Sequence, residues 1–200
     1  KKALGTVEPA MADFIDMMLE KHWIDAVVSD NKIGGAFYSR MNEFRMPRVF
    51  TSYMGTLTTV LQQGHELGHA YHYWVMRDMP AILTEFPMTL TETASTFNEA
   101  LIREAWREWY GDTTDEADDY LWAYKLHYYK TDQLIYNYPY TVGYLLSQGL
   151  LTELDRRGDD FMPFYKAMLR DTGRMTVDEI IGTHFKQNAE DPGFWRGCMK

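Results

Sequence analysis

The sequence contains a single cysteine, Cys198, among 200 residues. One cysteine excludes an internal disulfide framework and is typical of proteins in a reducing compartment, so we expect a cytoplasmic protein. No apolar run approaches the ~20 residues needed to cross a bilayer, and we expect no signal peptide. Basic residues are also scarce, because 20 Lys and Arg face 29 Asp and Glu, a net charge of −9. This balance disfavours nucleic acids and anionic membranes as partners.

Apolar residues make up 46% of the chain and aromatic residues 15%, which favours a folded domain with a substantial core. Residues 26–53 hold Gly34-Gly35, Pro47 and the short runs 36–38 and 49–51, which favours short strands at 35–39 and 48–52 joined by a turn-rich loop. Elsewhere apolar positions recur at helical spacing, and we expect helices over residues 8–22, 53–76, 87–110, 115–134, 139–157, 160–172 and 176–187. The sequence therefore predicts a mainly α fold with a small β element before the helix at 53–76.

A His-Glu-x-x-His motif lies in the helix expected at 53–76 and consists of His65, Glu66 and His69. Residues four apart share a helix face, so both imidazoles can bind one metal ion. Glu66 lies beside the first ligand, where its carboxylate can act as the general base on a zinc-activated water. A lone histidine on an apolar helix would more often be a core residue, but two at this spacing predict one Zn²⁺ per chain. The same donors also accept cobalt or manganese.

A catalytic zinc site usually has three protein ligands and one open position. A third histidine six residues after the second is excluded, because that position is Val75. Three glutamates follow, Glu85, Glu92 and Glu99. Glu85 falls in a loop or at the very start of the helix expected at 87–110 and reads as a surface charge. Glu92 lies one full turn inside that helix, and we choose it as the third ligand.

Two further residues are expected to support these ligands. Glu99 shares a helix face with Glu92 two turns further on, where it can bond a ligand imidazole and fix its tautomer. His72 shares the face of His65 but is two turns along the helix. We expect it to support the ligands or to face the substrate rather than to bind the metal.

Two segments together resemble the oligoendopeptidase F group of metallopeptidases, which is related to thimet oligopeptidase and neurolysin. Residues 64–72 read Gly-His-Glu-Leu-Gly-His-Ala-Tyr-His, and residues 92–99 read Glu-Thr-Ala-Ser-Thr-Phe-Asn-Glu. In that group the first Glu of the second segment is the third zinc ligand. This role carries over to Glu92, and the second Glu carries over to Glu99.

The resemblance covers essentially the whole chain and implies a thermolysin-like catalytic core. Segments 34–37, 126–129, 135–144 and 191–195 also look like the family. Family members run to several hundred residues, and their N-terminal helices form the far wall of a deep substrate channel. Because this chain is shorter and starts at Lys1 rather than Met, we expect a single catalytic domain over residues 1–200, a C-terminal core from a longer oligopeptidase.

The family's downstream His/Tyr motif supplies candidates for stabilising the charge that develops on the carbonyl oxygen during peptide hydrolysis. His127, Tyr136 and Tyr140 are the candidates, since the gap between the two tyrosines matches a tyrosine pair in thimet oligopeptidase-like enzymes. Pro139 can shift the start of the helix there, so Tyr138 and Tyr144 stay open as alternatives. Any of these rings can instead belong to the core.

The function expected from these features is zinc metalloendopeptidase action on short peptides, with Glu66 passing the proton to the leaving amine. A carboxypeptidase or dipeptidase is one alternative and would need a basic group such as Arg40, Arg45 or Arg48 to fix a C-terminal carboxylate. The other is a zinc-binding core that is inactive alone and pairs with itself or with the missing N-terminal part, because an absent channel wall would expose apolar surface.

Overall fold

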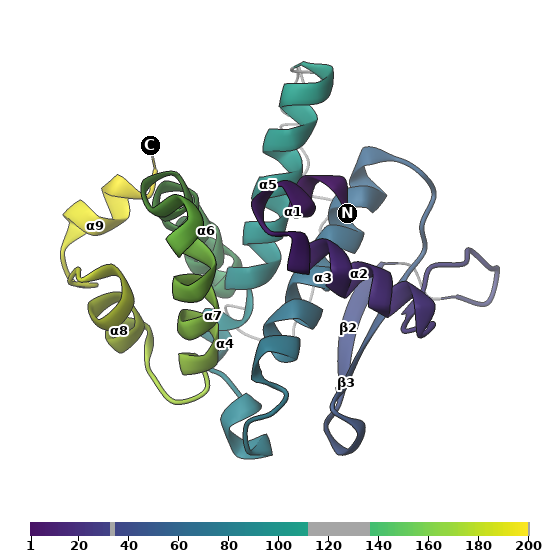
Figure 1. Cartoon of the computed structure of the whole chain (residues 1–200), viewed down its shortest axis with the longest axis horizontal. Helices are drawn as coiled ribbons and strands as arrows, with labels where there is room; N and C mark the ends of the chain where they lie inside the picture. Colours follow the sequence, from purple (N-terminus) through teal and green to yellow (C-terminus); the bar gives the residue numbers. More distant parts are fainter. Residues whose placement is uncertain (33–34, 112–136, 200) are drawn as a thin grey trace.

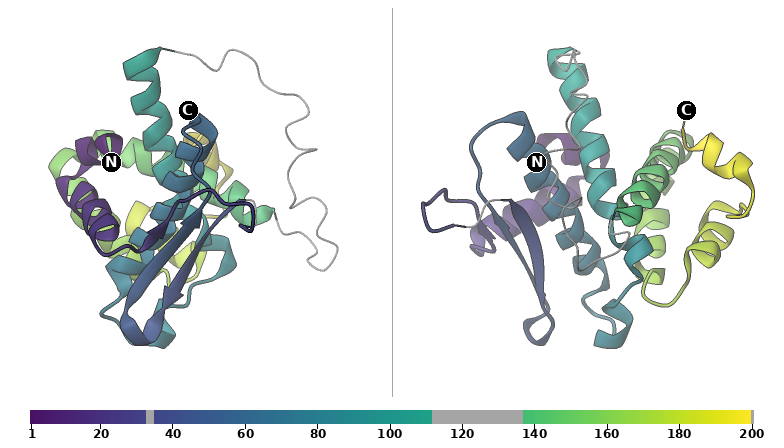
Figure 2. Two further views of the ribbon diagram at one scale, coloured as in Figure 1. Left: turned by 90° about the vertical axis from the view of Figure 1, so that its right-hand side faces the viewer. Right: turned by 180° about the vertical axis from the view of Figure 1, so that it is seen from behind.

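The computed structural model describes residues 1–32, 35–111 and 137–199. Two long helices, α3 (Leu57–Met76) and α5 (Thr93–Tyr110), run through the middle of the molecule and separate two groups of elements (Figures 1 and 2). The sheet and the first two helices lie on one side, and the C-terminal helices lie on the other. The remaining helices are α1 (Lys2–Val7), α2 (Pro9–Glu20), α4 (Met88–Thr91), α6 (Tyr138–Arg157), α7 (Phe161–Asp171), α8 (Val177–Ile180) and α9 (Pro192–Gly197). The expected mainly α fold with a small β element is therefore confirmed.

The sheet of the described residues has three strands in the order β1-β3-β2. The two expected strands form an antiparallel hairpin, β2 (Ala36–Met41) with β3 (Met46–Thr51). A third, two-residue strand, β1 (Ile24–Asp25), pairs parallel to β3 and was not expected, because two residues carry no periodic signal. β2 is left at the edge, with one row of backbone groups unpaired within the sheet.

The central helix α3 begins at Leu57, four residues later than the sequence predicts. Thr56 explains this start, because its side chain accepts a hydrogen bond from the backbone N–H of Thr59 and caps the helix. Gly68 lies where α3 meets α5, and a Cβ at this position would come within 2.5 Å of the carbonyl oxygen of Ala94. Asn98 of α5 adds a hydrogen bond of 3.1 Å from its amide to the carbonyl of Gly64. The missing side chains let the two helices touch backbone to backbone.

The single helix expected over 87–110 is wrong in one respect, because the helix is interrupted at Glu92. α4 ends at Thr91 and α5 starts at Thr93, and Glu92 between them has φ −90° and ψ 4°. Hence Glu92 lies at a junction of two helices rather than one turn inside a continuous one. The expected end of this segment is confirmed, since α5 stops at Tyr110 and Gly111 takes a positive φ of 74°.

The C-terminal helices follow the sequence pattern with small differences. α6 and α7 lie within one or two residues of the expected ranges, whereas the helix expected at 176–187 is a short α8 followed by a π-helical turn at 181–185. The N-terminal pattern divides into α1 and α2 at Glu8, and α9 was not expected. The helix expected at 115–134 lies outside the described residues. Among the helices that are described, none has the length and apolarity to span a membrane.

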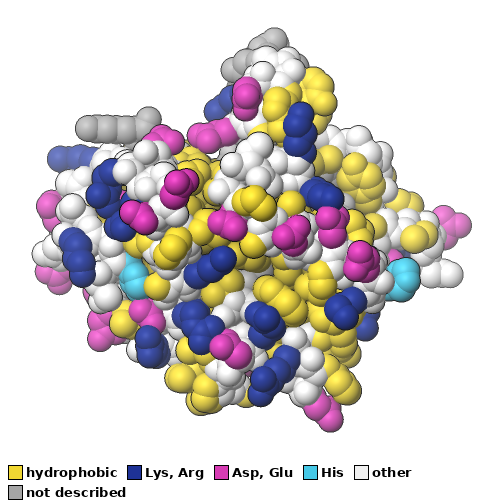
Figure 3. Space-filling model, in the orientation of Figure 1, with side chains coloured by type: hydrophobic (Ala, Val, Ile, Leu, Met, Phe, Trp, Pro, Cys, Tyr) yellow, Lys and Arg dark blue, Asp and Glu magenta, His cyan; other side chains and the backbone are white. Residues whose placement is uncertain are grey.

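The core lies where α3 and α5 pack against α2, α6 and α7. Its largest fully buried side chains are mostly aromatic or Met and Leu residues: Met11, Met18, Tyr73, Met76, Leu90, Phe97, Leu146, Leu150, Phe161, Tyr165, Met168 and Leu169. Acidic, basic and apolar side chains are interspersed over the face shown in Figure 3. The helix α3, which carries the His-Glu-x-x-His motif, is thus packed closely against α5 in the core.

Candidate metal centre

His65 and His69 lie one turn apart on α3 and direct the same ring nitrogen toward the same point. Their Nε2 atoms are 3.2 Å apart, and the two rings meet edge to face with centroids 4.9 Å apart. His69 is buried and His65 is nearly so. The i, i+4 spacing therefore produces a pair of convergent nitrogen donors at the surface where α3 meets α5.

Glu92 supplies a third donor from the junction between α4 and α5. Its Oε2 lies 3.1 Å from Nε2 of His65 and 3.3 Å from Nε2 of His69. Ligands bound to zinc at about 2.05 Å in a tetrahedron are themselves separated by about 3.3 Å. The three donor atoms have this spacing, so His65, His69 and Glu92 form a group that could hold a metal ion. They fit one face of a zinc tetrahedron and leave its fourth corner for another molecule.

Two side chains on α5 fix the orientation of these donors. Oε1 of Glu99 lies 2.7 Å from Nδ1 of His65, so Nδ1 carries the proton of the neutral ring and Nε2 faces the other donors. Ser95 donates a hydrogen bond of 2.8 Å to Oε2 of Glu92. His65 and Glu92 are thus each held by a second residue. These two supporting residues, Glu99 and Ser95, both lie on α5.

Hydrogen bonds within the cluster shift the pKa values of its members. Burial by itself would lower the pKa of His65, but hydrogen bonds to Glu92 and Glu99 outweigh it and raise that pKa to about 10. Burial likewise opposes ionisation of Glu92, yet hydrogen bonds to the two imidazoles hold its pKa well below the ordinary value. A metal ion bound by these donors would displace the proton on His65.

Glu66 lies on α3 between the two histidines and is buried, with 8% of its surface exposed. Burial raises the pKa of its carboxyl group, and the nearby histidines only partly offset this effect. The carboxylate also accepts a backbone hydrogen bond from Tyr38 on the edge strand β2. A carboxylate held in this way, with a pKa moved toward neutrality, is suited to taking and returning a proton.

His72 occupies a different environment from the one expected. It is fully buried, its Nε2 lies 2.8 Å from Oγ1 of Thr172, and its ring stacks on Phe86 with centroids 4.2 Å apart. Burial lowers the pKa of His72 to about 3. Its hydrogen bond goes to Thr172, the C-cap residue of α7. The expected substrate-facing role is wrong, because His72 is fully buried in the core, and the expected role in supporting the ligands stays a prediction.

The candidates for stabilising the developing oxyanion lie in different parts of the chain. His127 and Tyr136 lie outside the described residues. The ring of Tyr140, at the start of α6, stacks over His65 with centroids 6.4 Å apart. Tyr138 and Tyr144 are 40% and 56% exposed, and only Tyr140 of these three has a ring contact with a metal donor. α6 starts at Tyr138 with Pro139 in its first turn, so the proline sets the helix start.

Arg40, Arg45 and Arg48 were considered for binding a substrate carboxylate, and the structure places each in its own environment. Arg40 donates 2.6 Å to the carbonyl of Thr84 and pairs with Glu85. Arg48 donates 2.9 Å to the carbonyl of His22, and Arg45 sits at a turn with a φ of 51°. Glu85 thus has an ion-pair partner of its own and is not a member of the metal group.

Sequence reasoning missed two residues of the site. Ser95 is one of them, and its i, i+3 spacing from Glu92 was the signal for its hydrogen bond to that carboxylate. Tyr38 gave no local signal, because it reaches the site through the packing of β2 against α3. Its ring stacks near His69 with centroids 5.9 Å apart, and its backbone contacts Glu66.

His65, His69 and Glu92 form a candidate metal site on a helical core, and comparisons with known proteins find that the chain is similar to peptidases. Oligopeptidase PepF of Bacillus subtilis is 28% identical over 104 residues, which is 52% of this chain and 15% of that protein. Oligoendopeptidase F of Lactococcus lactis subsp. cremoris is 31% identical over 86 residues, 42% of this chain and 14% of that protein. No protein-family model matches the sequence.

Solved structures show the same fold. The structure of PZ peptidase A with an inhibitor has a TM-score of 0.75 at 16% identity and covers 99% of this chain. A Chlamydophila abortus protein assigned as a peptidase has a TM-score of 0.74 at 20% identity and also covers 99%. The chain spans 46% and 43% of the lengths of these two proteins. The expected resemblance is therefore confirmed, and the chain is a relative of the oligoendopeptidase F peptidases that spans only part of their length.

Proposed function

We propose that this chain is the catalytic core of a zinc metalloendopeptidase that hydrolyses short peptides. The observation that carries this proposal is the mutual spacing of 3.1 to 3.3 Å among Nε2 of His65, Nε2 of His69 and Oε2 of Glu92. When bound there, zinc would supply Lewis acidity toward a water molecule and a peptide carbonyl. The relatives named oligopeptidase and oligoendopeptidase support this choice of reaction.

Glu66 is the group that moves the proton in this proposal. Its buried carboxylate has a raised pKa, so it can accept a proton from a water molecule at neutral pH and later give it to the leaving amine. The backbone N–H of Tyr38 holds one side of this carboxylate. A fixed carboxylate contributes more than a mobile one, because its orientation is settled before the substrate arrives.

Two other parts of the site would handle the substrate. The edge strand β2 offers unpaired backbone groups beside Glu66, and an extended peptide can add to such an edge. Tyr140 lies over His65 at the start of α6, where its phenol can donate to a developing oxyanion. His127 and Tyr136 are proposed as further donors from the resemblance alone.

The test measures zinc content and peptide hydrolysis on the same samples of the wild type, Glu92→Ala and Glu66→Gln. We expect about one zinc per wild-type chain, a sharp loss of zinc in Glu92→Ala, and retained zinc with activity reduced by about 10²-fold or more in Glu66→Gln. Glu108→Ala is the matched control, because Glu108 is an exposed residue of the same helix α5.

The outcomes separate the proposal from its alternatives. Wild-type protein that stays free of zinc after supplementation contradicts the metal site. Zinc without hydrolysis favours a core that is inactive alone. A C-terminally amidated peptide that is left uncut, while its free-acid form is cleaved, favours a carboxypeptidase or dipeptidase.

A further inference from the structure

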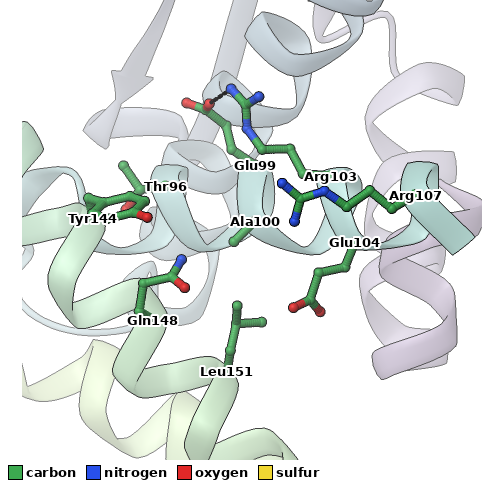
Figure 4. Close-up of a pocket in the computed structure, with 9 residues that line it drawn as sticks. All are labelled: Thr96, Glu99, Ala100, Arg103, Glu104, Arg107, Tyr144, Gln148 and Leu151. Carbon is green, nitrogen blue, oxygen red and sulfur yellow. Dashed lines mark hydrogen bonds and ion pairs between the residues drawn. The ribbon is translucent and has the colours of Figure 1, made fainter. Parts of the chain in front are cut away.

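A pocket of about 270 Å³ lies between α5 and α6, directly beside the metal centre. Its walls come from one face of each helix, and Figure 4 shows these side chains around a common space. The lining residues that matter here are Glu99, Arg103, Glu104 and Arg107 of α5, with Gln148 and Leu151 of α6. A pocket of this size accommodates one or two amino-acid residues rather than a folded partner.

Glu99 connects this pocket to the metal centre. One of its carboxylate oxygens lies 2.7 Å from Nδ1 of His65, and the other lies 3.2 Å from the guanidinium of Arg103. The same carboxylate therefore forms a wall of the pocket and supports a candidate metal ligand. The pocket and the candidate metal centre are therefore neighbours that share Glu99.

The two arginines of the pocket are in different situations. Arg103 is already paired with Glu99. The guanidinium of Arg107 points into the pocket (Figure 4), and within the described ranges no hydrogen bond or ion pair engages it. A guanidinium in this state presents a planar pair of donors that matches a carboxylate.

The other lining residues restrict where a ligand can lie. Burial and the nearby Asp155 raise the pKa of Glu104, while Arg107 partly offsets this. Because the carboxylates of Glu104 and Asp155 repel a like charge, a ligand carboxylate would bind on the side of Arg107. The amide of Gln148 can donate to it, and Ala100 and Leu151 offer apolar surface to the methylene groups next to it.

We propose that this pocket is a substrate subsite that binds a carboxylate of the peptide, with Arg107 as the residue that recognises it. The carboxylate is either the C-terminal group of a short peptide or an acidic side chain. This inference rests on the proposed peptidase function and adds a substrate preference to it. The residue that recognises the acidic group then lies on α5, because Arg40 and Arg48 donate hydrogen bonds to backbone carbonyls elsewhere.

The experiment measures binding of three peptides to the zinc-loaded Glu66→Gln chain by titration calorimetry. The peptides are N-acetylated pentapeptides of one Ala- and Gln-containing sequence: one with a free C-terminus, one amidated, and one amidated with a single Gln replaced by Glu. We expect one of the two carboxylate-bearing peptides to bind about fivefold to tenfold more tightly than the neutral one. The peptide that binds more tightly shows whether the pocket recognises a C-terminal carboxylate or a side-chain carboxylate.

Three substitutions in the same background assign the effect to the pocket. Arg107→Gln should abolish the preference, Glu104→Gln should increase it by about twofold to threefold, and Arg196→Gln should leave it unchanged. Arg196 is the matched control, because it is an exposed arginine on α9, away from the pocket. Equal binding of all three peptides, no binding of any, or a preference that survives in Arg107→Gln overturns the inference.

Hydrolysis by the wild-type chain is measured separately, so the two proposals can fail independently. A carboxylate preference that depends on Arg107, in a chain that cleaves nothing, leaves the subsite standing and contradicts the peptidase function. Hydrolysis of all three peptides at the same efficiency, with equal affinities, supports the peptidase function and removes the subsite.

Discussion

Gly143 of α6 packs directly against the backbone of Glu92. A Cβ at position 143 would lie 2.7 Å from both Cβ and the carbonyl oxygen of Glu92, and real Cβ atoms essentially never come so close. Because Glu92 is also the junction between α4 and α5, this contact supports the third metal donor from behind. Because Gly143 has no side chain, α6 can approach Glu92 closely and helps to position its carboxylate.

Substitution Gly143→Ala should displace this junction. We expect a loss of about 1 to 3 kcal/mol in the free energy of unfolding, as for other overpacked sites, together with weaker zinc binding because Oε2 of Glu92 moves. Denaturant unfolding and zinc titration measure the two effects. Gly197→Ala is the control, since nothing lies within 4 Å of a Cβ there. Wild-type zinc affinity in Gly143→Ala would show that the contact does not position Glu92.

Substitution Glu99→Gln should weaken zinc binding by about 10-fold to 100-fold, the usual effect of altering a residue that supports a histidine ligand. The reason is that the neutral amide no longer raises the basicity of His65 through its 2.7 Å contact with Nδ1. Competition with a chromophoric chelator measures the affinity. The exposed Glu108→Gln on the same helix should have the wild-type value, and an equal affinity in both variants would contradict the role of Glu99.

Removing zinc should destabilise the folded chain, because zinc binds the folded site in preference to the unfolded state. With free zinc at about 100 times its dissociation constant, the stabilisation is about 2.7 kcal/mol. For a chain of this size this corresponds to a rise in Tm of roughly 5 to 10 °C. Differential scanning calorimetry with and without a chelator tests it. Glu92→Ala should show no such difference, and a zinc-dependent Tm in that variant would place the ion elsewhere.

The core histidine His72 should make the fold sensitive to acid. Burial lowers its pKa to about 3 in the folded state, whereas the unfolded value is about 6.5. The unfolded chain therefore binds this proton first, so the stability contributed by neutral His72 is complete above pH 6.5 and is lost as the pH falls toward 3. The loss amounts to a few kcal/mol at most.

The comparison that isolates this effect is the stability of the wild type and His72→Gln between pH 7 and pH 4. The glutamine amide can keep the hydrogen bond to Thr172, which the imidazole makes at 2.8 Å, but it does not titrate. We expect the two pH curves to converge in acid. His22→Asn controls for an exposed histidine with a positive φ of 54°, and its curve should run parallel to that of the wild type. Parallel curves for His72→Gln would refute the prediction.

Local pattern was sufficient for much of the fold and the site. The helices that carry the motif and the β hairpin before it follow from periodicity, because burial of one face imposes a 3.6- or 2-residue repeat on the sequence. The convergence of His65 and His69 follows from the same geometry, since residues four apart on a helix must point the same way. The spacing of Glu92 and Glu99 along the chain was enough to single out both residues, although the continuous helix expected around Glu92 is interrupted there.

Contacts between distant segments had no such local signal. The break at Glu92 could not be read from residues 87–110, because it coincides with a contact made by Gly143 some fifty residues later. Tyr38 reaches Glu66 only because β2 lies at the edge of the sheet that packs on α3. His72 lies on the same helix as the metal ligands, yet its partner Thr172 is a hundred residues away and draws it into the core.

The sequence by itself determined which potential metal donors are present and how they are spaced along each helix. Helical geometry is local, so donors on one helix are placed by the sequence alone. The tertiary structure decided which donors meet and which are buried apart from them. This arrangement depends on Gly68 and Gly143. Because these residues have no side chains, helices from distant parts of the chain can make backbone contact there.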